Sequence, residues 1–517
     1  MPLSEAEIVL LRPPVSISTA TWHISNAPPL GMAYLCASLK QNNFQVKVID
    51  ALGEDLENYG PTKNNKIFYR GLSPEAIIKA IPNTSKLLMV SCMFSIDWNH
   101  VREIIIKIKQ EFPNLTILVG GEHITAIPKY ILESTPEIDY CCLGEGDEFV
   151  IEFCKSFFSN QGLESINGLA FRKHGQVIVN PKRNRIKSVN ELPWPAWDDF
   201  PIENYLDSQI AFGIELGRTM PMLATRGCPY ECTFCSNDNM WGTNYYARDP
   251  KDIIAEINYY KKKYNITGIE FHDLTIFVGK KWIVDFCTQL IENEINLDWT
   301  VTVGTRSEGL DAQSLKLLKD TGCKYICFAP ESGSERMLKD SKKRLDLGRI
   351  LKTIKLSSDI GLLTKVNIII GFPEEKRLDI LKTFLFVWKC AALGVDDTGF
   401  TIFYPYPGSK LFYQIYKEGE ITLGEDFFNE LFNWEILKFR KHYCKHVSSF
   451  ELTLYKFFGI SSFYLLSYLL HPRKIFSLLI NFRKGTYTTR LEKFLYGLFV
   501  KKDNFVHKIA KQMKSQA

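Results

Sequence analysis

The sequence predicts an α/β protein in three parts: an N-terminal doubly wound Rossmann-like domain, a partial (β/α)6 barrel of the TIM type, and a C-terminal helical extension. Two observations lead to this prediction. Short Val, Ile and Leu runs alternate with longer amphipathic segments before residue 160 and again from 220 to 430, whereas the chain ends in apolar and basic segments. We expect the Rossmann-like domain at 1–160, a connector at 161–217, the barrel at 218–430 and the helical extension at 431–517.

Length and composition set the broad class. The chain has 517 residues, of which 45% are hydrophobic and 23% are charged, as in ordinary globular proteins of several domains. This composition excludes a disordered chain and a small disulfide-stapled scaffold. The net charge of +5 is too small over this length to indicate nucleic-acid binding.

Charge and cysteine usage point to a reducing compartment and a basic tail. No basic and apolar leader precedes the first strand-like run, so we expect a cytoplasmic protein with its 13 cysteines reduced. A tight cysteine cluster there predicts a metal or catalytic site. Residues 451–517 hold twelve Lys and Arg against three Asp and Glu, a net charge of +9, which leaves −4 for residues 1–450.

The first domain has the rhythm of βαβ units. Strands of a parallel sheet are buried on both faces, so they are expected to form continuous apolar runs. The expected strands and helices are Ile8–Leu11, Pro29–Lys40, Val46–Asp50, Leu87–Ser91, Val101–Glu111, Thr116–Val119 and Tyr140–Leu143. Glycine-containing turns follow two of these strands, at Gly120 and Gly121 and at Gly144 and Gly146, the edge where open α/β sheets bind ligands.

The connector begins with a predicted hairpin, Leu169–Val179, and continues into a segment with three prolines between 193 and 201. The βα alternation then resumes. The expected barrel strands are Pro221–Thr225, Gly268–His272, Trp299–Val303, Tyr325–Ala329, Thr364–Ile370 and Asp397–Phe403. Six such units indicate an open barrel with its chemistry at the carboxyl ends of the strands.

The C-terminal extension carries an uncharged run, Phe457–Leu470, that is shorter than the roughly 18 residues needed to span a bilayer. Two interpretations remain open. The segment 451–517 forms an interfacial, basic surface attracted to anionic lipid, or it forms a helical cap on the barrel with its basic face in solvent.

Three cysteines stand directly after the first barrel strand, in the sequence TRGCPYECTFC. Cys228, Cys232 and Cys235 are separated by three and then two residues. Three thiolates from one loop can bind three irons of a 4Fe-4S cluster and leave the fourth iron open to a non-protein ligand. The alternative is a zinc site, which would need a fourth Cys or His at close spacing, and none follows Cys235.

These motifs resemble the radical S-adenosylmethionine (radical SAM) superfamily, whose signature is CxxxCxxC after the first barrel strand. The resemblance implies that the open iron binds S-adenosylmethionine and that one-electron reduction yields a 5′-deoxyadenosyl radical, which abstracts hydrogen from an unactivated carbon. It assigns Phe234 to the adenine, and His272 and Asp273 to the methionyl amino group. Glu331 and Ser332 are assigned to the ribose. Ile369 and Gly371 are assigned to an adenine motif that Glu374 or Glu375 closes.

Each assignment has a simpler alternative. Asp273 and Glu331 could cap helices, a common role for an acid after a strand. Gly371 could belong only to a turn. The functional interpretation is favoured because all these residues fall at strand carboxyl ends.

The N-terminal motifs VLLRPP, NAPPLGMAYLCASL, LVGGEH and LGEGDE are similar to the cobalamin-binding domains of cobalamin-dependent radical SAM enzymes. The resemblance implies that Gly120, Gly121, Gly144 and Gly146 contact the cofactor. The DxHxxG motif of other cobalamin domains is absent, because the comparable segment 50–55 has no histidine. His123 is the nearest alternative, as a cobalt ligand or as an ordinary loop histidine.

We therefore predict a cobalamin-dependent radical SAM enzyme that methylates an unactivated carbon of a small molecule. An external donor supplies the electrons. If the segment 451–517 contacts membranes, we expect a lipophilic substrate. One alternative is a radical oxidoreductase or cyclase of the anaerobic tetrapyrrole type. The other is a non-catalytic iron–sulfur or cobalamin sensor.

Overall fold

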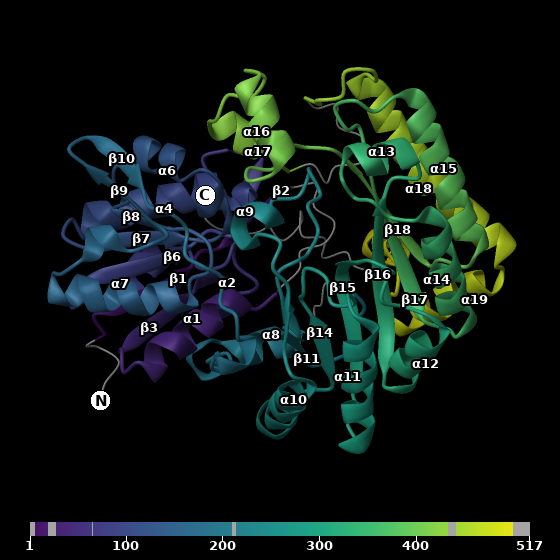
Figure 1. Ribbon diagram of the computed structural model, residues 1–517, viewed down its shortest axis with the longest axis horizontal. Coiled ribbons are helices and arrows are strands. Elements are labelled where there is room, and N and C mark those ends of the chain that lie inside the picture. Colours follow the sequence, from purple (N-terminus) through teal and green to yellow (C-terminus); the bar gives the residue numbers. More distant parts are fainter. Residues whose placement is uncertain (1–5, 19–26, 65, 209–212, 433–440, 500–517) are drawn as a thin grey trace.

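The computed structural model describes residues 6–18, 27–64, 66–208, 213–432 and 441–499. It has two α/β parts, one on the left and one on the right of Figure 1. A seven-stranded sheet with the order β10-β9-β8-β7-β6-β1-β3 organises the first part. Its strands are β1 (Ile8–Arg12), β3 (Val46–Asp50), β6 (Leu87–Ser91), β7 (Thr116–Gly120), β8 (Tyr140–Cys142), β9 (Leu169–Lys173) and β10 (Gln176–Val179).

Helices cover both faces of this sheet, as predicted. They are α1 (Leu30–Gln41), α2 (Ala51–Glu54), α3 (Pro74–Ala80), α4 (Trp98–Glu111), α5 (Glu122–Ala126), α6 (Pro128–Ser134) and α7 (Asp147–Ser159). Alternate residues of β1 enter different cores: Leu10 packs with α1 and α7, and Leu11 packs with α4. The central strands β1, β6 and β7 are buried on both sides, which is why their sequences are almost continuously apolar.

Two features of the first part lie outside the simple βαβ pattern. A small antiparallel sheet of β2 (Val15–Ser18), β5 (Ile67–Arg70) and β4 (Tyr59–Pro61) was not predicted, because its strands are short and carry no regular alternation. The predicted hairpin is confirmed as β9 and β10, and β9 pairs antiparallel with β8. The beginning of the segment 161–217 therefore extends the first sheet, while the domain boundaries stay a prediction.

The second part is a sheet of six parallel strands in sequential order, β11-β14-β15-β16-β17-β18. Its strands are β11 (Thr219–Met222), β14 (Gly268–Phe271), β15 (Asp298–Thr305), β16 (Cys323–Glu331), β17 (Leu363–Ile370) and β18 (Asp397–Ile402). This arrangement confirms the partial barrel. The first strand ends earlier than expected, because the chain then forms β12 (Thr225–Arg226), which pairs with β13 (Tyr246–Ala247).

Helices surround the convex face of the barrel (Figure 1). They are α10 (Pro250–Tyr264), α11 (Lys280–Glu292), α12 (Ala312–Asp320), α13 (Glu335–Asp340), α14 (Leu347–Asp359) and α15 (Arg377–Ala392). Two short helices lie outside this ring: α8 (Ile202–Ser208) precedes the barrel, and α9 (Asn237–Trp241) follows the cysteine loop.

The chain returns to the first part after the barrel. The two helices α16 (Lys410–Lys417) and α17 (Glu425–Glu430) lie at the top of Figure 1, and Asn99 of α4 donates a 2.9 Å hydrogen bond to the Glu425 carbonyl of α17. The extension then forms α18 (Ser449–Leu470), which packs on α15 and β18, followed by α19 (Arg473–Lys484) and α20 (Arg490–Phe499). No helix in the described part of the chain is long and apolar enough to cross a membrane.

Candidate functional site

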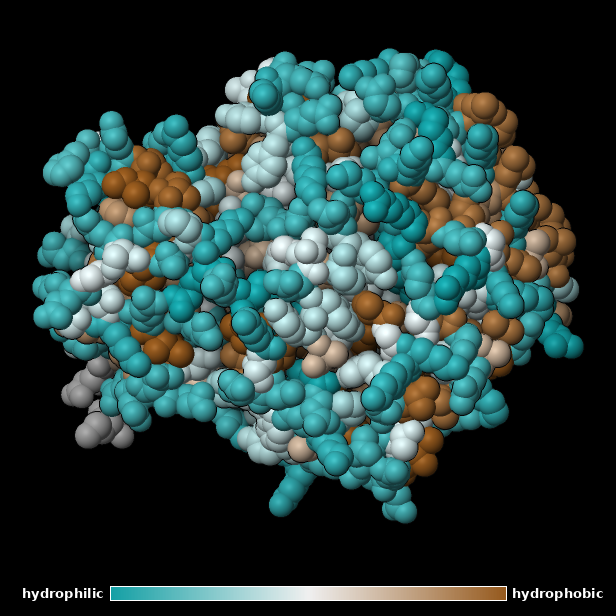
Figure 2. Space-filling view, in the orientation of Figure 1, coloured by the Kyte–Doolittle hydropathy of each residue, from teal (hydrophilic) through white to brown (hydrophobic). Residues whose placement is uncertain are grey.

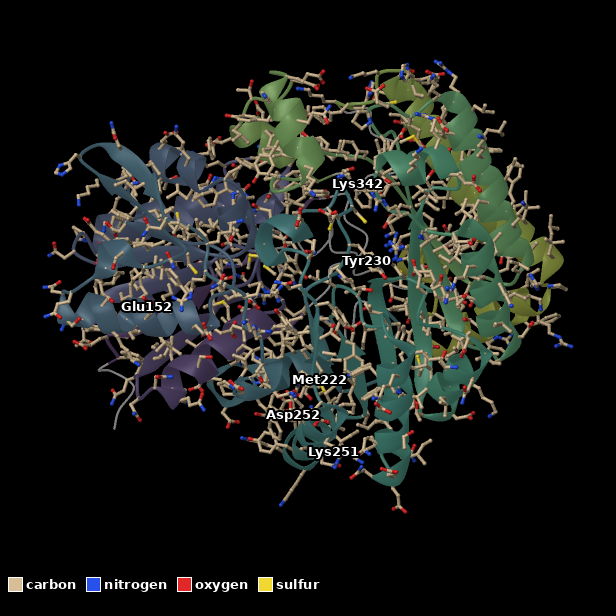
Figure 3. The ribbon with its side chains drawn as sticks, in the orientation of Figure 1. Glu152, Met222, Tyr230, Lys251, Asp252 and Lys342 are labelled. Atoms are coloured by element: carbon tan, nitrogen blue, oxygen red, sulfur yellow. The ribbon has the colours of Figure 1, made fainter. Side chains whose placement is uncertain are left out.

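The cysteine loop lies between the two parts of the molecule. Tyr230, which belongs to this loop, is labelled near the centre of Figure 3, above Met222 of β11 in that view. Two backbone hydrogen bonds fix the loop: Thr233 N–H donates to Ser341 O at 2.9 Å, and Leu411 N–H donates to Thr233 O at 2.9 Å. The loop is thus tied to the segments that follow α13 and β18.

The loop starts at a glycine that no other residue could replace without strain. Gly227 has a φ of 86°, and a Cβ there would lie 2.1 Å from the Asn244 carbonyl oxygen. Cys228 and Cys232 are half-buried and Cys235 is exposed, and none of the three forms a disulfide. In the described residues no three Cys, His, Asp or Glu side chains converge on a single-ion site. A zinc site would need a fourth Cys or His beside these three thiols, and none follows Cys235 in the sequence.

Two buried cations face the cysteine loop, and the sequence analysis did not find them. Lys343 pairs with Glu331 at 3.1 Å, and Arg306 lies 3.8 Å above the centre of the Tyr230 ring. Burial raises the pKa of Cys228 and Cys232, and the charges of Lys343 and Arg306 act in the opposite direction. Such cations would stabilise the thiolates that bind a cluster.

Glu331 and Ser332, the predicted ribose contacts, end β16 under unusual constraints. Glu331 is buried with a φ of 65°, a left-handed conformation that is uncommon for a non-glycine residue and typical of functional sites. Its carboxylate binds Lys343, so it does not serve as a helix cap. The Ser332 hydroxyl lies 3.2 Å from that of Thr383 and accepts a hydrogen bond from Ser334 N–H. The contacts with ribose stay predictions.

Asp273 anchors the strand that leads into the cysteine loop. Its carboxylate accepts hydrogen bonds from Ala224 N–H, at 3.1 and 3.2 Å, and from the Thr225 hydroxyl. Burial raises its pKa to about 6, although these hydrogen bonds act against the shift. Asp273 therefore caps no helix and instead positions the strand before the cysteine loop. The neighbouring His272 lies with its Nε2 3.1 Å from the Glu270 carboxylate.

The predicted adenine motif forms a tight turn at the end of β17. Gly371 has a φ of 84°, and its N–H donates to the buried carboxylate of Glu375, which also accepts from Phe372 N–H at 3.2 Å. Glu375, and not the exposed Glu374, closes the turn. The Phe372 ring packs edge-on against Phe234 with a centroid distance of 5.6 Å, so the turn and the aromatic residue of the cysteine loop are in contact.

The glycines of the first domain lie on the same side as the cysteine loop. Gly121 has a φ of 116°, and a Cβ there would lie 2.4 Å from the Cys92 carbonyl oxygen. A Cβ on Gly144 would meet only the Met240 carbonyl oxygen of α9, at 3.8 Å. Gly120 ends β7, and Gly146 precedes α7. Their contacts with cobalamin stay predictions.

His123 is a core histidine. Its Nδ1 lies 2.8 Å from the Ser95 hydroxyl, its ring is fully buried between Trp98 and Phe428, and Nε2 has no partner in the described structure. Burial lowers its pKa to about 3. This packing favours the ordinary histidine over the cobalt ligand.

An ion pair and a hydrogen bond join the first domain directly to the cysteine loop, and the sequence alone did not reveal them. Arg226 lies two positions before Cys228, and its guanidinium binds the buried Asp147 carboxylate at 2.7 and 3.2 Å. Ser236, next to Cys235, donates to Glu122 of α5. The loop and the glycine turns of the first sheet therefore form one site.

The residues at this junction fit large cofactors. Apolar side chains are left exposed at the carboxyl ends of strands in both parts, where a packed interior would bury them: Met93, Phe94, Leu274, Val303 and Tyr406. Phe94, for example, is 62% exposed. Exposed apolar side chains beside glycine turns and placed charged groups are typical of cofactor binding.

Comparisons with known proteins agree with this arrangement. The family model for the radical SAM superfamily matches residues 222–387, and that for the B12 binding domain matches residues 25–153. An uncharacterized methyltransferase of Pyrococcus horikoshii is 30% identical, over 78% of this chain and 82% of the relative. Cytidylyl-2-hydroxyethylphosphonate methyltransferase of Streptomyces wedmorensis is 25% identical, over 79% and 82%. An anaerobic magnesium-protoporphyrin IX monomethyl ester cyclase of Cereibacter sphaeroides is 23% identical, over 76% and 61%.

Solved structures share the fold. The radical SAM methyltransferase TsrM of Kitasatospora setae superposes with a TM-score of 0.61 at 17% identity, covering 80% of this chain and 76% of TsrM. The cobalamin-dependent radical enzyme OxsB superposes with a TM-score of 0.64 at 16% identity, covering 98% and 76%. The fold, the cysteine loop and these matches together show that the chain belongs to the cobalamin-dependent enzymes of the radical SAM superfamily, which use a 4Fe-4S cluster, S-adenosylmethionine and cobalamin.

Proposed function

We propose that the protein transfers a methyl group to an unactivated carbon of a small molecule. The observation that carries the proposal is the contact between the cysteine loop and the first domain, through the Arg226–Asp147 ion pair and the Ser236–Glu122 hydrogen bond, because methyl transfer needs both cofactors at one substrate. The names of the Pyrococcus and Streptomyces relatives support it. When bound, the cluster with S-adenosylmethionine supplies a hydrogen-abstracting radical, and cobalamin supplies the methyl group.

The chain itself orients these groups and excludes water. Cys228, Cys232 and Cys235 would hold the cluster, and Asp273 fixes the strand that presents them. Lys343 and Arg306 place positive charge beside the thiolates. The edge-on pair of Phe234 and Phe372 covers the loop with apolar surface, which protects a reactive radical from side reactions.

We also propose that the reducing electron comes from an external donor. The ten cysteines outside the loop are all buried, and no group of three or more metal-binding side chains was found among the described residues. They offer no second cluster through which the chain could relay an electron.

The alternative activity is a radical cyclase or oxidoreductase, which the Cereibacter relative favours by its name. The test uses S-adenosylmethionine with a trideuterated methyl group, under anaerobic conditions with a chemical reductant. Methyl transfer predicts the label in the cobalamin extracted from the enzyme, in addition to 5′-deoxyadenosine. If 5′-deoxyadenosine forms and the cobalamin stays unlabelled, the cyclase alternative replaces the methyltransferase. If S-adenosylmethionine is not cleaved at all, the non-catalytic sensor replaces both activities.

We further propose that the extension makes peripheral contact with an anionic membrane and that the substrate is lipophilic. Large apolar side chains on α15, α18 and α19 are exposed: Leu378, Leu381, Leu385, Phe450, Leu454, Phe457, Phe458, Leu465, Leu469, Leu470, Ile475, Phe476, Leu479 and Ile480. In Figure 2, brown side chains gather along the right edge, where Figure 1 places these helices. Contiguous apolar surface of this extent marks an interaction site.

The charges around this apolar face favour lipid as the partner. The exposed charged side chains of α19 are all basic, namely Arg473, Arg483 and Lys484, and α15 adds Lys382 and Lys389. Two acids beside these helices are paired with basic residues: Glu451 with Arg377 at 2.7 Å, and Asp396 with Lys474 at 3.0 Å. A basic rim around apolar helices suits an interfacial surface on anionic lipid. The cap interpretation is compatible with this proposal, because α18 packs on β18 with its other side.

A further inference from the structure

The inner face of the barrel carries a group of polar side chains that the cysteine chemistry does not use. In β17, Val366, Ile368 and Ile370 pack into the main hydrophobic core, so the alternate residues Lys365 and Asn367 face inward. In register, Lys365 lies between Cys327 of β16 and Asp397 of β18. These residues form one layer of the barrel interior.

The C-terminal extension adds a second cation to this layer. Arg490, the first residue of α20, lies over Gly399 of β18, which is the register partner of Asn367. A Cβ on Gly399 would lie 2.9 Å from Arg490 Nη1 and 2.9 Å from Asn367 Oδ1. The glycine therefore makes room for the guanidinium beside the amide.

The charges of this layer are not balanced. Asp397 is buried and already accepts hydrogen bonds from the Tyr464 hydroxyl and from its neighbour Thr398 N–H. Within the described residues, Lys365 and Arg490 form no hydrogen bond and no ion pair; Lys365 is half-buried and Arg490 is exposed. Burial and the nearby Arg490 charge both lower the pKa of Lys365. Two adjacent cations repel each other, and an anion between them would remove that cost.

We propose that Lys365, Arg490 and Asn367 form a subsite for an anionic group of the substrate, either a carboxylate or a phosphate. This inference rests on the proposed function, because it places the substrate in the interior of the barrel. The guanidinium and the ammonium donate charge-assisted hydrogen bonds, and the Asn367 amide keeps one N–H free besides the one that contacts Cys327 Sγ at 3.2 Å.

The test measures anion binding by isothermal titration calorimetry of the full-length holoenzyme, with inorganic phosphate and with acetate as probes. We expect one site per chain, weakened about tenfold or more in Lys365→Met and in Arg490→Met, because a hydrogen bond to a charged group contributes roughly 1.5–3 kcal/mol. Lys352→Met, a change of the same charge on the exposed side of α14, should leave the affinity unchanged. The ratio of the two affinities distinguishes a phosphate from a carboxylate group.

Two outcomes overturn the subsite. Either the wild-type enzyme binds neither probe more tightly than about 10 mM, or the Lys365 and Arg490 variants bind as the Lys352 control does. Lys365→Arg and Arg490→Lys keep the charges and should keep the binding, which separates loss of the site from loss of folding. Anion binding does not depend on cleavage of S-adenosylmethionine, so failure of the subsite and failure of methyl transfer are read separately.

Discussion

The buried ion pair between Arg226 and Asp147 is expected to hold the cysteine loop against the first domain. Arg226 stands just before Gly227 and Cys228, and Asp147 is the first residue of α7, directly after the Gly144–Gly146 turn. Both side chains are buried, and the two bonds between them are 2.7 and 3.2 Å long. We predict that Asp147→Asn, which removes the charge and keeps the shape, loosens both segments.

The magnitude follows from the burial of the pair. Removing one partner of a buried ion pair costs about 3–5 kcal/mol, since the other charge stays uncompensated. Here Glu145 lies 3.6 Å from Arg226, and the Tyr34 ring lies 4.8 Å from the guanidinium carbon. Because these neighbours stay in place, we expect the lower value, about 3 kcal/mol. That loss corresponds to an increase of about a hundredfold in local opening.

Hydrogen–deuterium exchange read by mass spectrometry measures this opening segment by segment, without requiring the whole chain to unfold in one step. Peptides that cover residues 144–148 and 225–228 should exchange about a hundredfold faster in Asp147→Asn. The matched control is Asp320→Asn, which breaks the exposed pair with Lys316 and should change exchange less than about fivefold. Arg226→Met combined with Asp147→Asn should restore most of the protection. If Asp147→Asn behaves as the control does, the pair does not hold the loop.

Three further predictions concern separate parts of the fold. Gly121→Ala should cost about 1–3 kcal/mol in stability and reduce the cobalamin retained after gel filtration, because its Cβ would lie 2.4 Å from a carbonyl oxygen. Gly31→Ala, with open space around it, should do neither, and equal retention in both variants would refute the contact of Gly121 with cobalamin. Burial raises the pKa of Glu375 to about 8, so the stability that its neutral form contributes is complete below pH 4 and is lost as the pH rises toward 8. In Glu375→Gln the melting temperature should therefore depend less on pH between 5 and 8, and the same pH dependence as in the wild type would contradict the raised pKa. The double variant Phe476→Ser, Leu479→Ser removes two exposed apolar side chains of α19 and should reduce sedimentation of the protein with anionic vesicles several-fold. Unchanged sedimentation would mean that the extension serves only as a helical cap on the barrel.

The sequence was sufficient for the strands of both large sheets. Central strands of the first sheet are buried on two faces and are apolar, so a run such as 87–91 can be recognised without a structure. The barrel strand 363–370 alternates polar and apolar residues, and its place in the βα alternation indicates it. The small sheet of β2, β4 and β5 could not be predicted, because strands of three or four residues leave no periodic pattern.

The candidate site divides in the same way. The cysteines share one loop, so their spacing alone reveals them. Partners that meet only in space left no signal: Asp147 is 79 residues from Arg226, and Glu122 is 114 residues from Ser236. The choice between Glu374 and Glu375 also needed the structure, because only burial against the Gly371 turn distinguishes two adjacent acids.

The most direct test of the central claim is the metal content of the enzyme purified without oxygen. The account predicts about four irons and matching sulfide per chain, with the broad visible absorbance of a 4Fe-4S cluster. Cys232→Ala should lose both the cluster and the cleavage of S-adenosylmethionine, while Cys154→Ala, which changes a buried cysteine of α7, should keep them. Zinc at this loop, no metal at all, or full activity in Cys232→Ala would contradict the account.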